Sequence, residues 1–154
     1  MAQTTGGKTF IKASIDLSAN NSDWTEIDGY GAAIAVSGGT RNAPEQHTFD
    51  GDTPIVKGGK RAALDVEVRF VYTEAAAQPF EVARAIYETE GGEGYVRYSP
   101  LGDTAESGGS VFRFTSPLSV MTDFVYPQGS AEGNEVILGG FTMKCPYLTK
   151  SELT

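Results

Sequence analysis

The sequence has few of the residues from which enzyme sites are built. It contains one cysteine, one histidine and one tryptophan in 154 residues. A single cysteine excludes a disulfide within the chain. A hydrolase or transferase needs a nucleophile, a base and a group that orients the base, and the sequence pattern assembles no such set. We therefore expect no enzyme activity and no cofactor.

Positive charge and long apolar runs are also scarce. Twelve Lys and Arg residues stand against 20 Asp and Glu residues, which gives a formal net charge of −8. A surface that binds nucleic acid needs clustered Lys and Arg, so the negative net charge argues against a nucleic-acid-binding surface. It does not exclude a surface that DNA passes without adhering. Met1 to Lys8 has no apolar run, so we expect neither a signal peptide nor a membrane span, and synthesis in the cytoplasm.

The remaining candidates for chemistry have simpler interpretations. His47 lies near Glu45, Asp50 and Asp52, but this spacing matches no recognised metal site. Asp50-Gly51-Asp52 resembles part of a calcium loop, yet the other ligands are missing, which favours an acidic turn. Cys145 falls late in an apolar strand, which indicates a buried structural thiol. We expect no metal site.

Alternation of apolar and polar residues dominates the chain and predicts a mainly β fold. The best example is residues 64–72, where Leu64, Val66 and Val68 begin one apolar face. The predicted architecture is a β-sandwich or barrel of about 7–8 strands in a single domain over 1–154. The expected strands are 9–17, 24–27, 30–36, 64–72, 95–99, 111–115, 118–126, with a bulge, and 135–145.

One flanking helix is expected at about 79–90. Pro79 suits a first helical turn, and Gly91-Gly92 suits a helix end. Pro127 is expected to end a strand and open a turn. Residues 1–8 are predicted to be a flexible N-terminal arm and residues 147–154 a short C-terminal arm.

Residues 37–60 form a long segment between two well-defined strands. Glycine pairs lie at both ends, and the segment shows little periodicity. Loops of this length inside a compact domain are uncommon and usually functional or disordered. Phe49 and Ile55-Val56 argue against plain disorder, because exposed apolar groups on an arm favour a partner surface. We predict a long hairpin arm.

Taken in order, these features resemble the major tail tube protein of long-tailed bacteriophages over roughly residues 9–148. The motifs that carry the resemblance are Ala35-Val36-Ser37-Gly38-Gly39, Phe49-Asp50-Gly51-Asp52 with Pro54-Ile55, the 65–73 strand ending Val71-Tyr72-Thr73-Glu74, the helix near Pro79-Phe80, Phe124-Val125-Tyr126-Pro127, and Gly140-Phe141-Thr142-Met143-Lys144. Contractile-tail and secretion-system tubes share this fold.

The resemblance implies a β-sandwich flanked by a helix, with subunits that join in hexameric rings. Stacked rings would form the hollow tube of a virion tail, through which DNA passes. The implied partners are other copies, tail terminator and tail-tip or baseplate proteins, and a tape measure protein and DNA in the lumen, with no membrane. The expected ring-stacking residues are Gly38, Arg41, Phe49, Asp50, Asp52, Ile55, Val56 and Lys57.

The sequence leaves two other classes of function open. One is a β-sandwich binding module for carbohydrate or a cell-surface ligand, with Trp24, Tyr30 and Tyr95 as stacking candidates. Aromatics exposed together in a groove would support it, and burial of all three would remove it. The other is a small metal-assisted enzyme around His47.

Overall fold

The computed structural model describes residues 13–102, 111–133 and 135–153, apart from the side chain of Ala32. The predicted N-terminal arm and the start of the first predicted strand lie outside these residues. The described chain contains one helix, α1 (Pro79–Glu88). Its strands are β1 (Ser14–Ser18), β2 (Trp24–Glu26), β3 (Gly31–Gly38), β4 (Glu45–Gln46), β5 (Ile55–Val56), β6 (Leu64–Val71), β7 (Glu93–Ser99), β8 (Val111–Thr115), β9 (Ser119–Gln128), β10 (Leu138–Cys145) and β11 (Thr149–Leu153).

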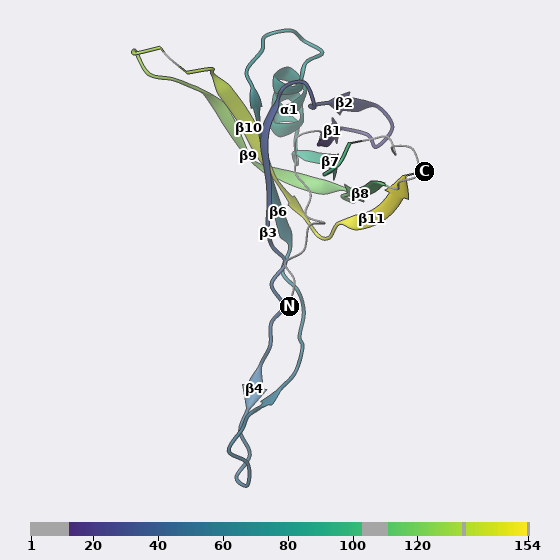
Figure 1. The fold of residues 1–154 in the computed structure, drawn as a ribbon, viewed down its shortest axis with the longest axis vertical. Coiled ribbons are helices and arrows are strands. Elements are labelled where there is room, and N and C mark those ends of the chain that lie inside the picture. Colours follow the sequence, from purple (N-terminus) through teal and green to yellow (C-terminus); the bar gives the residue numbers. More distant parts are fainter. Residues whose placement is uncertain (1–12, 103–110, 134, 154) are drawn as a thin grey trace, which may run out of the picture.

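Nine strands form one antiparallel sheet that folds into two layers (Figure 1). Strand β7 belongs to both layers. Its first residues, Glu93 and Gly94, pair with β9, whereas residues 95–99 pair with β1. The β3 layer has the order β9-β10-β6-β3, and the β7 layer has the order β2-β1-β7-β8-β11. The predicted sandwich is confirmed, with more strands than expected. The alternative of a barrel is wrong, because the sheet does not close.

The hydrophobic core lies between these layers and beneath α1. Strand β6 shows the predicted period of two, since Val66, Val68 and Phe70 are fully buried and the residues between them are only partly so. Phe141 and Met143 on the neighbouring strand β10 are equally buried. Burial of one face of each strand holds the register, because a slip of one residue would turn the apolar set to solvent.

Helix α1 covers the core between the layers. Phe80, Ala83 and Ile86 are its buried residues together with the predicted first residue Pro79. The helix stops at Glu88, two residues before the expected end, and the Thr89 backbone N–H bonds to the carbonyl of Ala85. Gly91 and Gly92 follow with φ of 84° and 58°, a conformation that favours glycine.

Several strand bounds differ from the prediction. Strand β10 begins at Leu138 instead of 135, β7 begins at Glu93 instead of 95, and β3 runs on to Gly38. Two further differences arise from pairing between distant segments. Strand β9 continues through Pro127 to Gln128. Among the described strands, this end of β9 pairs only with β10, so the N–H that Pro127 lacks is not required for pairing on the other side. The predicted bulge is present as two register shifts between β9 and β10. The C-terminal residues are not an arm. Residues 149–153 form β11, which pairs with β8 along its whole length.

Gly140 on β10 permits close contact with β6, and replacing it should be costly. A Cβ at this position would collide with the carbonyl oxygen of Val68 and lie 2.9 Å from Cδ of Arg69. We expect Gly140→Ala to lower the free energy of unfolding by about 2–3 kcal/mol in urea titrations. Gly129→Ala is the matched control, because a Cβ there meets nothing within 4 Å. Equal stability of the two variants would contradict the close contact.

Candidate assembly surfaces

The predicted long segment is a hairpin arm that leaves the body between β3 and β6 (Figure 1). Backbone pairs at its base continue the β3–β6 register, including the bond from the Ala62 N–H to the Thr40 carbonyl. Farther out, β4 pairs with β5. Two extended legs of about eleven residues would reach about 35 Å from the body. The arm is therefore a projection about as long as β9, which has 10 residues and is the longest described strand of the sheet.

The base of the arm is held by a glycine and an arginine. Gly38 has φ of 82°, and a Cβ there would lie 2.7 Å from the Ala63 carbonyl oxygen, so the turn out of β3 requires glycine. Arg41 joins the two legs, because its Nη1 donates to the Gly59 carbonyl at 2.9 Å. These two predicted stacking residues therefore shape the arm, whatever else they contact.

The other predicted stacking residues line the outer part of the arm and face solvent. Phe49 at the tip is fully exposed, and Ile55 and Val56 expose half or more of their surface. A monomer gains nothing from such groups, so they favour a surface that binds a partner. Asp50, Asp52 and Lys57 are also exposed. Seven of the eight predicted residues thus lie on the arm, and Gly38 is the last residue of β3 at its base.

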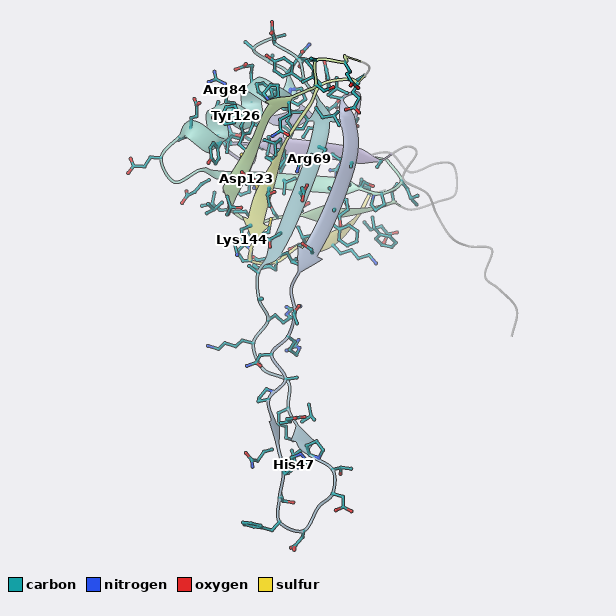
Figure 2. All side chains as sticks on the ribbon, turned by 90° about the vertical axis from the view of Figure 1, so that its left-hand side faces the viewer. His47, Arg69, Arg84, Asp123, Tyr126 and Lys144 are labelled. Atoms are coloured by element: carbon teal, nitrogen blue, oxygen red, sulfur yellow. The ribbon has the colours of Figure 1, made fainter. Side chains whose placement is uncertain are left out.

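A second surface is the outward face of the β3 layer, which Figure 2 views with Arg69, Asp123 and Lys144 labelled. The register places Lys144 beside Asp65, and Arg69 forms a 2.7 Å ion pair with Glu67. Three acidic and two basic side chains therefore share this face, namely Asp65, Glu67, Asp123, Arg69 and Lys144. Each cation has a carboxylate neighbour. The chain's excess of negative charge is consequently not concentrated here.

Both edges of the β3 layer are open within the part of the chain that the structure describes. Strand β3 pairs only with β6, and β9 beyond Met121 pairs only with β10 among the described strands. Unpaired edge strands offer rows of backbone N–H and C=O groups to another chain. The sequence predicted the strands but could not show which of them lie at an edge.

The residues of the alternative predictions do not form a single site. Trp24 and Tyr95 share one face of the β7 layer through the register of β1, but the Arg97 guanidinium lies 4.1 Å from the centroid of the Trp24 ring. Tyr30 packs instead against the core. All three are partly buried. No groove therefore presents these rings together for stacking.

His47 and its acidic neighbours lie at the outer end of the arm and are exposed (Figure 2). Within residues 13–102, 111–133 and 135–153, no group of three or more His, Cys, Asp and Glu side chains could hold a metal ion. The same part of the chain has no helix long and apolar enough to cross a membrane.

Cys145 is fully buried at the end of β10, which confirms the predicted structural thiol. Burial raises the pKa of the Cys145 thiol, and the hydroxyls of Ser116 and Ser119 oppose this shift only in part. The thiolate fraction at pH 8 is therefore reduced. We expect a thiol reagent to modify the native protein at least ~100-fold more slowly than the urea-unfolded protein. Rapid native labelling would show that β10 opens locally.

Comparison with known proteins gives the class of this fold. No family model matches the sequence, and no curated protein matches it. Solved structures do match. The sheath/tube terminator of the extracellular contractile injection system PVC superposes with a TM-score of 0.67 at 12% identity, over 97% of this chain and 99% of that one. The PVC sheath-tube complex gives 0.64 at 10% identity, over 99% and 100%. The SPP1 tail tube gives 0.63 at 8% identity, over 96% and 80%.

These superpositions identify the architecture as the tail-tube fold. They extend over nearly the whole chain, so the two layers, the helix and the arm are compared together. The resemblance that the sequence motifs suggested is thereby confirmed at the level of the fold. At such low identity the likeness speaks for the fold alone, and function must be argued from the surfaces.

Proposed function

We propose that this protein is a structural subunit of a phage-like tail tube and has no enzymatic activity. Its copies assemble into hexameric rings, and the rings stack into a hollow tube through which DNA passes. The observation that carries the proposal is the β3 layer, which has an exposed face and two open edges in a chain with the tail-tube fold.

The strand directions in the β3 layer support ring closure. All neighbouring strands in its order β9-β10-β6-β3 are antiparallel, so the two outer strands, β3 and β9, also run in opposite directions. Rotation about a common axis brings β3 of one copy beside β9 of the next with an antiparallel relation. A closed ring would remove both open edges and form a continuous β wall.

The exposed face of the β3 layer would then line the lumen. DNA adheres to clustered cations that replace its counterions. Arg69 and Lys144 are the basic residues of this face, and Glu67 and Asp65 lie beside them. With Asp123 added, the face carries a small net negative charge. A wall of this kind would let a polyanion pass without holding it.

The proposed role as a tube subunit also implies the partners and the location of the protein. The arm, with residues 1–8 assisting, would join one ring to the next. The ends of the stack would meet a terminator and a tail-tip or baseplate protein, and a tape measure protein would occupy the lumen before DNA. The solved relatives include a tube terminator, a tube-terminating cap and a baseplate, which supports these partners. The assembled protein would be located in the virion tail after synthesis in the host bacterial cytoplasm.

Negative-stain electron microscopy of the concentrated protein, with light scattering for mass, tests this proposal. We expect rings with a central hole, and stacks of such rings. The mass of the smallest assembled species should be six times that of the chain. A protein that remains monomeric at high concentration, also when terminator and tail-tip proteins are added as initiators, would contradict the proposal.

A further inference from the structure

A group of exposed apolar residues lies at the end of the β9–β10 hairpin. Val136 is 67% exposed, Tyr126 53%, Ile137 44% and Leu138 40%. Three of them are consecutive, so this group is not the outer face of an ordinary strand. Exposed apolar residues gathered in this way mark a contact surface. We name Tyr126, Glu132, Glu135, Val136, Ile137 and Leu138 the hairpin-end patch.

The hairpin-end patch and the arm project from opposite ends of the molecule (Figure 1). An arm therefore cannot cover the patch of its own chain, but it can reach the patch of another copy. A contact between two different surfaces at opposite ends does not close on itself, and it repeats from copy to copy. Such a contact produces an open stack along the long axis.

The chemistry of the two surfaces is complementary. Ile55 and Val56 on the arm are exposed beside Lys57, and the apolar residues of the patch lie beside Glu132 and Glu135. Over the whole arm, residues 39–61, four basic and three acidic residues give a charge of +1, and the rest of the sequence carries −9. Three of the four basic residues lie at the base of the arm, so Lys57 is the one Lys or Arg beside Ile55 and Val56, and Glu45 lies opposite Val56 in the register of β4 and β5.

We propose that the hairpin-end patch is the surface that binds the arm of a second copy stacked on the first. Ile55 and Val56 of one copy pack on the apolar residues of the patch, and Lys57 pairs with Glu135. The inference rests on the proposed function and deepens it, because it names the surface that receives the arm. Phe49 lies beyond this contact and reaches farther along the neighbouring copy.

Cysteine cross-linking tests the contact directly. Val56→Cys and Val136→Cys subunits are mixed, assembled and oxidised, and the native Cys145 stays buried. We expect disulfide-linked dimers in the mixture and none from either variant alone. Replacing the second partner by Leu118→Cys, another exposed apolar site, should give none. Tubes that form without the 56–136 dimer would overturn this contact but leave the proposed function standing. Wild-type protein that does not stack would overturn both.

A charge exchange provides the second test. Lys57→Glu and Glu135→Lys should each raise the protein concentration needed for tubes by about tenfold, because each places like charges together in every repeat of the contact. The double variant K57E/E135K should recover the wild-type concentration. Glu90→Lys is the matched control, since Glu90 is exposed on the turn after α1. A double variant that assembles no better than either single variant would overturn the pairing.

Discussion

Removing the arm is expected to leave a folded subunit that no longer forms tubes. The cut is made where the Ala62 N–H bonds to the Thr40 carbonyl, and an Asn-Gly turn replaces the residues between them. The body should keep its stability, because the arm contributes no residue to the hydrophobic core and a shorter loop loses less entropy on closing. Ring stacking should be abolished, because the exposed apolar groups of the arm are gone.

The experiment compares the thermal unfolding midpoint with tube formation in negative stain. A full-length variant that carries Phe49→Ser, Ile55→Ser and Val56→Ser is the matched control for arm length. It should fold and fail to stack as the shortened variant does. Long tubes from the shortened protein would refute the stacking role of the arm, and long tubes from the serine variant would show that arm length matters more than apolar contact.

Blocking the open edge of β3 should prevent ring closure without unfolding the subunit. The Gly39 N–H bonds to the Ala63 carbonyl, and antiparallel pairs alternate, so the N–H of Ala35 faces β6 and that of Val36 faces the open edge. Val36→Pro removes only the outward donor. We expect a loss of about 1 kcal/mol in unfolding free energy and no rings in light scattering or electron microscopy.

Ala35→Pro is the matched control for this edge. It removes a donor to β6 inside the sheet, and it should lower the free energy of unfolding by about 3 kcal/mol. The two variants differ by one position and carry the same new residue, so the contrast between them isolates the direction of the lost N–H. Rings formed by Val36→Pro at the wild-type concentration would show that β3 does not pair with a neighbouring copy.

Much of the fold could be predicted from local patterns. Strict alternation identified β6, and five residues of alternating character identified β8 with its observed bounds. The glycine-bounded segment with exposed apolar residues was predicted to be an arm, and the structure shows one. The burial of Cys145 followed from its place in an apolar strand. Each of these features depends on residues that are close in sequence.

Other features depend on pairing between distant segments. The residues predicted to be a C-terminal arm form strand β11 instead, because residues 149–153 pair with β8. Strand β9 runs through Pro127 because that part of it is an edge. Apart from proline, every residue carries the same backbone N–H and C=O groups, so no local pattern marks β3 as an edge.

The sequence by itself determined that the chain is mainly β, that one helix interrupts it, and that a long arm leaves the body, because periodicity and turn residues act over a few positions. Only the tertiary structure decided that Arg69 and Lys144 share a face with Glu67, Asp65 and Asp123, and that the hairpin-end patch lies opposite the arm. The physical reason is that strand order and register are fixed by the burial of one common core, to which every strand contributes.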